Sequence, residues 1–182
     1  SAYLRRVGIG VLDPTVHGDL QRFETMLEWE HSNLREMARF IRIFAQRRAE
    51  IPVILRPHPS ENHRPWAECF AQMPNVHIVT DRDHIPWIMA ARATIHTSCT
   101  TGLESRLLGT PAIGLCPDQH PWHAGFISNQ VSYVSATGAD AVEAVEELLC
   151  HDLGAVASAG AEALLVVCAA LGWRRSCRRP TA

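Results

Sequence analysis

Short apolar runs alternate with longer helical stretches along most of this 182-residue chain, and this alternation constrains the fold more than any other feature. The short runs suit buried strands, and the longer stretches carry apolar residues at helical spacing. Strands that alternate with helices predict a parallel sheet covered on both faces. We therefore predict an α/β, Rossmann-like three-layer domain with about six parallel strands over residues 1–150.

The expected elements follow one another closely. Strands are expected at residues 6–12, 51–56, 76–80, 93–97, 111–115 and 131–134. Helices are expected at residues 19–48, 66–73, 85–91, 101–108 and 139–150. The Asn33-x-x-Glu36 pattern resembles a capping box and is compatible with a break of the first helix near residues 31–32. Gly109, with Pro111 just beyond it, is typical of a helix C-terminus.

The C-terminal segment has a different composition. Residues 154–172 are apolar and rich in Ala, and four arginines follow between positions 174 and 179. Its length approaches that of a membrane span, but Glu162 lies near its middle and many positions are Ala or Gly. We expect residues 151–182 to form a packed or amphipathic terminal helix with a basic tail.

Charge and cysteine content exclude several classes of protein. The 17 Lys+Arg and 19 Asp+Glu residues give a net charge of −2, which argues against nucleic-acid binding through a broad basic surface. The six cysteines are scattered without a C-x-x-C pattern, so we expect no zinc site, no disulfide framework and no cofactor. No export signal is evident, and a cytoplasmic protein, at most peripheral to the inner face of the membrane, is expected.

A proline-rich element follows the second expected strand. It reads Arg56-Pro57-His58-Pro59, and its two prolines hold the backbone rigid around one imidazole. Ligands of parallel sheets bind at the carboxyl ends of the strands. Arg56 or His58 could face a phosphate there, and His58 could change its charge near neutral pH. A rigid surface loop without a ligand is the alternative.

A second polar element follows the fourth expected strand and leads into a helix. Backbone N–H groups at a helix start favour an anion, whereas plain N-capping needs only one hydroxyl. We interpret this turn as a phosphate cradle, in which Gly102 permits close approach and Glu104 caps the helix or binds a ribose diol. The hydroxyl residues of the turn are Thr97, Ser98, Thr100 and Thr101.

Residues 116–123, after the fifth expected strand, bring polar groups and an aromatic to the same edge. A Ser-His-Asp triad could be assembled from these parts, but the chain has no G-x-S-x-G elbow, and we discount a triad. The chain also lacks a P-loop and a G-x-G-x-x-G motif. We therefore expect no nucleotide-binding loop of either of these two types.

Residues 51–135 resemble the C-terminal, nucleotide-binding half of GT-B-type bacterial surface-polysaccharide biosynthesis proteins. The HP and Ser/Thr elements resemble those of polysialyltransferases and capsular Kdo transferases. The TTGLE and LGTP segments resemble those of UDP-GlcNAc 2-epimerases and CDP-glycerol glycerophosphotransferases. The similar segments read ILRPHPSEN, NVHIV, IPWIMAARATIHTSCTTGLESRLLGTPAIGL and FISNQVSYV.

The resemblance implies the donor-binding domain of a capsule or surface-polysaccharide glycosyltransferase, with a CMP-, CDP- or UDP-linked sugar as ligand. His58 would be catalytic, as a proton donor, and Arg56 would contact the donor phosphate. Glu104 would lie near the ribose. The cradle would consist of Thr97, Ser98, Thr100, Thr101 and Gly102.

A GT-B enzyme has two Rossmann-like halves, and this chain has room for one. The resemblance therefore implies a separate acceptor domain or a homo-oligomer as partner, and the isolated chain is expected to bind its donor without turning it over. Two alternatives stay open. One is an enzyme similar to UDP-GlcNAc 2-epimerases, and the other is a non-catalytic interaction module that needs a separate acceptor domain.

Overall fold

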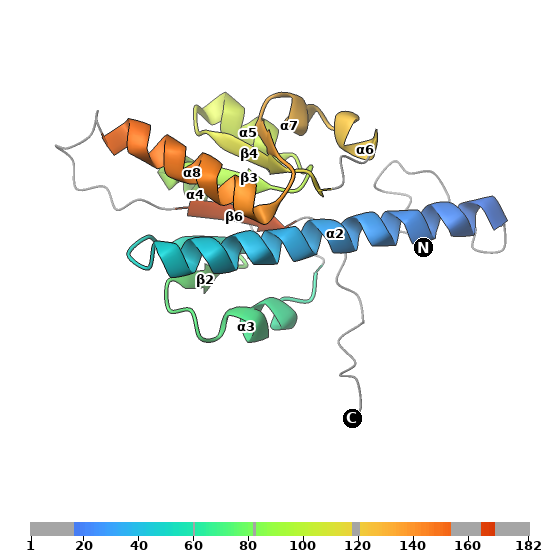
Figure 1. Cartoon of the computed structure of the whole chain (residues 1–182), viewed down its shortest axis with the longest axis horizontal. Helices are drawn as coiled ribbons and strands as arrows, with labels where there is room; N and C mark the ends of the chain where they lie inside the picture. The colour runs from blue at the N-terminus through green and yellow to red at the C-terminus, as the bar shows by residue number, and fades with distance from the viewer. Residues whose placement is uncertain (1–16, 60, 82, 118–120, 154–164, 170–182) are drawn as a thin grey trace.

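Helices cover both faces of a six-stranded, all-parallel sheet (Figure 1), which confirms the predicted α/β, Rossmann-like class. The computed structural model describes residues 17–59, 61–81, 83–117, 121–153 and 165–169. Its elements, in chain order, are α2 (His17–Arg47), β1 (Val53–Pro57), α3 (Arg64–Phe70), β2 (Val76–Ile78), α4 (Ile85–Ala90), β3 (Ala93–His96), α5 (Thr101–Leu108), β4 (Ala112–Leu115), α6 (Pro121–Ala124), α7 (Ile127–Gln130), β5 (Tyr133–Ser135), α8 (Gly138–Leu153) and β6 (Leu165–Ala169).

The strands expected between residues 51 and 134 are confirmed as β1 to β5, and the expected helices are confirmed as α2, α3, α4, α5 and α8. The helix boundary predicted at Gly109 is also confirmed. Gly109 follows α5 with a φ of 81°, in the left-handed region that favours glycine, and its N–H bonds back to the last turn. The strand expected at residues 6–12 lies outside the described residues.

The middle of the sheet corrects our expectation for the C-terminal segment. We predicted a helix over residues 154–172, but Leu165–Ala169 form β6, which pairs in parallel with both β1 and β3. The strand order is β2-β1-β6-β3-β4-β5. Leu165, Val166 and Val167 are buried, as suits a strand covered on both faces. In a doubly wound sheet this middle position normally belongs to the first strand of the chain.

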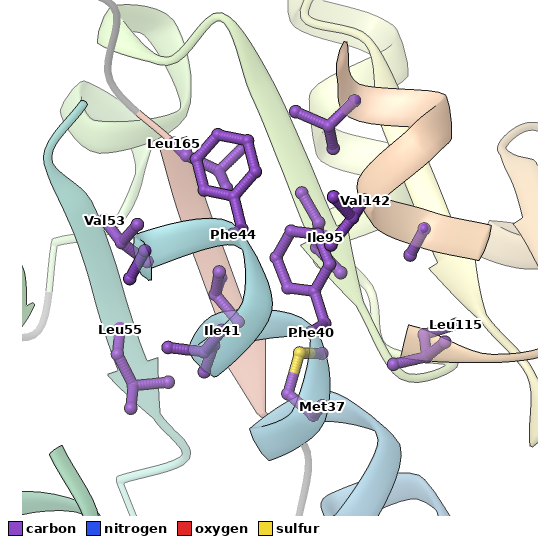
Figure 2. Close-up of a cluster of buried hydrophobic side chains, with 14 of the residues drawn as sticks. Met37, Phe40, Ile41, Phe44, Val53, Leu55, Ile95, Leu115, Val142 and Leu165 are labelled. Carbon is purple, nitrogen blue, oxygen red and sulfur yellow. The ribbon is translucent and has the colours of Figure 1, made fainter. Parts of the chain in front are cut away.

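The larger core lies between the sheet and the helices α2, α3 and α8. Figure 2 shows Phe40 and Phe44 of α2 lying over the strands, with Ile95 and Leu165 among their neighbours. The opposite face is covered by α4 and α5, where a smaller cluster includes Ile54 and Val166. Successive side chains along a strand thus point to opposite faces of the sheet, and both faces are packed, as expected for the middle layer of three.

Helix α2 is continuous, so the break considered near residues 31–32 is wrong. Asn33 is buried within the helix, and the Glu36 carboxylate accepts the backbone N–H of Gly138, 2.7 Å away, instead of capping a helix. At about 1.5 Å per residue the helix is about 45 Å long, much longer than the strands beneath it. Its N-terminal half extends past the carboxyl ends of the strands (Figure 1). Among the described helices, none is both long and apolar enough to cross a bilayer.

Candidate functional site

The carboxyl edge of the sheet brings the two predicted motifs close together. The chain runs from β1 outward to β2 and from β3 outward to β4 in the opposite direction, so the sheet reverses its order around β6. Such a point of reversal is where open α/β sheets bind ligands. Only β6 separates the end of β1 from the end of β3, which places the two motifs about 10 Å apart at the usual strand spacing.

The turn from β3 into α5 has a strained backbone and an uncapped helix start. Ser98 has a φ of 57°, and no other described residue except glycine has a positive φ. This left-handed conformation costs about 1–2 kcal/mol for a residue with a side chain. Thr100 occupies the N-cap position without a side-chain capping bond. The Thr100 hydroxyl therefore does not cap the helix, and the backbone N–H groups of Thr101 and Gly102 are turned towards Cys99.

The Ser98 side chain is buried in a polar network drawn from four segments of the chain. Its Oγ lies 2.9 Å from Nδ1 of His123 and accepts a hydrogen bond of 2.9 Å from the Asn129 amide. The Asn129 amide also donates to the His123 backbone carbonyl, at 2.8 Å. Trp29, on the part of α2 that extends over this edge, donates its indole N–H to Nε2 of His123, at 2.9 Å.

Nε2 of His123 has two partners of opposite character. The Trp29 indole N–H, a donor, lies 2.9 Å away, and the Pro117 carbonyl, an acceptor, lies 3.1 Å away. The direction of the hydrogen bond between Nδ1 and Ser98 depends on which of the two nitrogens carries the proton. In either direction, the contact ties the turn after β3 to α6.

The His96 ring leaves no room for a side chain at position 102, so this position requires glycine. A Cβ at this position would lie 2.2 Å from Nε2 of His96, which no packed structure accommodates. His96 is therefore one reason for glycine at this position, and the close approach of a ligand to Gly102 stays a prediction. His96 is fully buried, bonds the Ser132 hydroxyl at 2.9 Å, and has its pKa lowered to about 4 by burial. Its imidazole is consequently neutral at physiological pH.

Arg56 is buried at the end of β1, and its charge is already matched. It forms an ion pair with the Asp81 carboxylate and donates to the Asp81 backbone carbonyl at 2.8 Å. Asp81 also accepts the Trp87 indole N–H, at 2.9 Å. These hydrogen bonds from Arg56 and Trp87 lower the pKa of Asp81. Arg56 thus lies at the carboxyl edge of the sheet, and its charge there is paired with that of Asp81.

His58 and Glu104 complete the set of predicted residues. His58 is partly buried, and this burial lowers its pKa, so the ring is mainly neutral at physiological pH. Glu104 projects from the first turn of α5 and lies 2.7 Å from Nε2 of His84, the residue before α4. Of the hydroxyl residues, Thr97 and Ser98 are buried, Thr101 is mostly buried and Thr100 is exposed.

The sequence interpretation missed the partners of the turn. Residues 116–123 were expected at this edge, but His123 was not singled out, and Trp29 and Asn129 had no local signal. Asn129 is contributed by α7, a four-residue helix that carries no clear periodicity. Within the described residues, no group of three or more His, Cys, Asp or Glu side chains is arranged to hold a metal ion.

Comparisons of the chain with protein-family models, with curated proteins and with solved structures gave no match. The resemblance to GT-B-type proteins therefore remains an expectation based on motifs. What the site does has to be inferred from the residues and contacts at the carboxyl edge.

Proposed function

We propose that the carboxyl edge binds the phosphate of a nucleotide sugar, as the donor-binding domain of a glycosyltransferase in bacterial surface-polysaccharide biosynthesis. One observation carries the proposal. An uncapped helix start, α5, follows a buried serine in the left-handed conformation at the point where the sheet reverses its order. Strained residues persist where the surroundings hold them, and they cluster at ligand sites.

The residues of the predicted cradle fall into two groups. Some are buried and hold the turn in place, and the others would contact the phosphate. Ser98 Oγ is already engaged by His123 and Asn129, so it shapes the turn. Thr97 is buried as well. The exposed Thr100 hydroxyl would then touch a phosphate directly. The Thr101 hydroxyl and the backbone N–H groups of Thr101 and Gly102 are engaged by Cys99 in the empty site and would exchange this partner for the phosphate. Dipoles aimed at the leaving phosphate would stabilise the charge that develops on it during transfer.

Arg56 and His58 would act from the end of β1. A bound phosphate would compete with Asp81 for the single positive charge of Arg56. His58 is neutral in the empty site and would donate a ring N–H to the phosphate. A phosphate nearby would raise the pKa of His58 again, which is what the role of proton donor requires. Glu104 would accept hydrogen bonds from the ribose.

Calorimetric titration tests the proposal with CMP, CDP, UDP and their sugars. The expected result is saturable binding of at least one nucleotide, with the free nucleoside binding more weakly because it lacks the phosphate. Asp81→Asn should strengthen binding severalfold by releasing Arg56, whereas the control Asp83→Asn, in the same loop, should not. Well-folded protein that binds none of these nucleotides at millimolar concentration would contradict the proposal. Product analysis with UDP-GlcNAc separates the epimerase alternative, which releases UDP and ManNAc.

A second candidate, an interaction module for a separate acceptor domain, is favoured by one surface. Ile127 of α7 and Tyr133 and Val134 of β5 are 58%, 64% and 59% exposed, and β5 is an edge strand. Exposed apolar side chains that lie together mark interaction surfaces. Size-exclusion chromatography with light scattering tests this candidate. A monodisperse monomer whose elution is unchanged by Val134→Lys, and that retains no partner, would count against it.

A further inference from the structure

Six buried polar atoms lie without a hydrogen-bond partner among the described residues, and four of them belong to two neighbouring segments. Two of these four come from α2, the Oε2 of Glu30 and the Oδ1 of Asn33, and two come from the loop after β1, the Oε1 of Glu61 and the Nε2 of His63. The remaining pair, Nδ1 of His96 and Oδ1 of Asn129, lies on β3 and α7. Buried polar groups are almost always hydrogen-bonded, so four orphans in one region require an explanation.

The two segments face each other beyond the ends of the strands. Glu30 and Asn33 are one helical turn apart, so their side chains lie on the same side of α2. The adjacent Trp29 bonds His123 after β4, which places this part of α2 over the carboxyl edge. Glu61 belongs to the loop after β1 and is close enough to Glu30 for their charges to interact. Asn33 is 3% exposed and Glu61 is 8% exposed.

The Glu61 side chain is held in place from the opposite side. The Trp66 indole N–H donates to its Oε2 at 3.1 Å, and its own backbone N–H donates to the His58 carbonyl at 2.8 Å. The second carboxylate oxygen is left buried and unpaired. Glu61 is therefore held as an acceptor with a fixed orientation. Glu30 is only partly buried as a residue, although its Oε2 is buried, so it lies between the cluster and the surface.

The charges of the surrounding groups favour a cationic occupant. Glu30 and Glu61 repel each other when both are ionised. Of the basic side chains on the adjoining segments, Arg64 pairs with Glu68, at 2.7 Å, and Arg35 lines the cavity between α2 and α3. The remaining titratable groups of the loop are His58 and His63, both of them weak bases. A metal ion is not favoured, because no described group of His, Cys, Asp or Glu side chains has the arrangement to hold one.

We propose that Glu30, Asn33 and Glu61 form a binding site for the primary ammonium group of a small organic ligand. An ammonium group has three N–H donors and one positive charge, which matches three acceptor oxygens and a carboxylate pair. His63 borders the site and accepts or donates according to its tautomer. The residues of this ammonium site differ from those of the phosphate cradle, and the proposal does not depend on it.

Protonation of the two carboxylates makes the site sensitive to pH. Burial, together with the charge of Glu61, raises the pKa of Glu30 to about 8, and burial raises the pKa of Glu61 to about 7. The empty site therefore holds protons at neutral pH, and an ammonium ligand has to displace them. Affinity should increase as the pH rises from about 6 to about 8, since an alkyl ammonium stays charged over this range.

Ethanolamine and ethylene glycol form a matched pair of probes, because they differ in one ammonium group. NMR titration of the folded protein should give saturable millimolar binding of ethanolamine and none of the glycol. Calorimetry at neutral pH in two buffers of different ionisation enthalpy should show proton release on binding of ethanolamine. The control Glu28→Gln, an exposed position on the same helix, should leave the affinity unchanged.

Glu30→Gln and Glu61→Gln should each lower the affinity for ethanolamine by about tenfold or more, since a charge-assisted hydrogen bond contributes that much. Both changes remove a buried charge and keep the side-chain shape, so the fold should persist, and thermal melting checks this. If either variant unfolds, the other variant and the pH profile of the unaltered protein decide. Equal binding of the two probes, binding unaffected by both substitutions, or affinity constant from about pH 6 to about pH 8 would overturn the proposal.

Discussion

The Nδ1 atom of His123 lies 2.9 Å from the Oγ atom of Ser98, although 25 residues separate these side chains in the sequence. The contact joins the turn after β3 to α6, and the other nitrogen of the ring is held between the Trp29 indole and the Pro117 carbonyl. His123 therefore supports Ser98 from a fixed position. The most polar part of the carboxyl edge is organised to hold a backbone turn in one conformation.

Ser98→Ala and Ser98→Gly should differ in stability because the backbone at this position is left-handed. Both variants lose the hydroxyl, so Nδ1 of His123 loses this partner and the Asn129 amide keeps only its bond to the His123 carbonyl, which costs about 1–3 kcal/mol. Glycine also removes the strain, so Ser98→Gly should unfold at a higher urea concentration than Ser98→Ala, by about 1 kcal/mol. Equal stability of the two variants would show that the turn is not strained.

Gly102→Ala should destabilise the protein, because the new Cβ would overlap the His96 ring. Overpacking of a closed core costs about 1–3 kcal/mol, which urea unfolding can resolve. Gly18→Ala is the matched control, since no atom lies within 4 Å of a Cβ there. The control should be neutral or stabilising by up to about 1 kcal/mol, because alanine is the better helix former. A Gly102→Ala variant as stable as the control would contradict the packing described.

His96 should make stability depend on acidity. Burial lowers its pKa from 6.5 to about 4 in the folded protein. The unfolded chain takes up a proton near pH 6.5, so the stabilisation due to the neutral ring is present above that pH. It is lost as the pH falls towards the folded value, by about 3 kcal/mol in total.

Urea unfolding of the unaltered protein and of His96→Gln at a series of pH values measures this effect. The stability difference between the two should shrink as the pH is lowered from about 6.5 to about 4. Glu30 and Glu61 contribute with the opposite sign, since their raised pKa values reduce stability as the pH rises, but they are common to both proteins. A difference that stays constant would mean that His96 titrates normally.

Leu165→Ala tests the position of β6. Leu165 is buried between β1 and β3 in the larger core, and removal of such a side chain costs about 2–5 kcal/mol. Leu107→Ala, at a position that is 77% exposed, should change stability by less than about 0.5 kcal/mol. Thermal melting of the two variants compares them directly. Similar melting temperatures would contradict a buried central strand at residues 165–169.

Local patterns predicted much of this fold because the responsible interactions are local. The helix at Thr101–Leu108 and its end at Gly109 follow from apolar spacing and from a residue that tolerates a positive φ. β6 was missed because alanine-rich surroundings favour helix, whereas the tertiary position between two strands decides the outcome. The Asn33–Glu36 pattern misled for the same reason, since Glu36 bonds the distant Gly138.

The candidate site could likewise be predicted from the sequence only in part. Its position followed from polar residues at strand ends, which is a property of the sequence and of parallel sheets. The partners of those residues did not, because Trp29, His123 and Asn129 meet Ser98 only through tertiary packing. Glu30 and Asn33 carried a weak signal. Asn33 lies about one helical turn before the buried Met37, and Glu30 about two turns before it. Both are polar at positions where the apolar stripe of α2 would otherwise continue.

Backbone amide NMR during titration with CMP, and with cytidine as the control without phosphate, tests the central claim most directly. The account predicts that CMP shifts the amides of Thr100, Thr101 and Gly102 along a saturable curve, while cytidine leaves them in place. The shifts should be lost in the Ser98→Ala variant, because the turn then lacks the hydroxyl that His123 and Asn129 hold, and retained in Thr25→Val on α2. Saturable CMP binding whose shifts avoid the start of α5, or the same shifts with cytidine, would contradict a phosphate cradle at this turn.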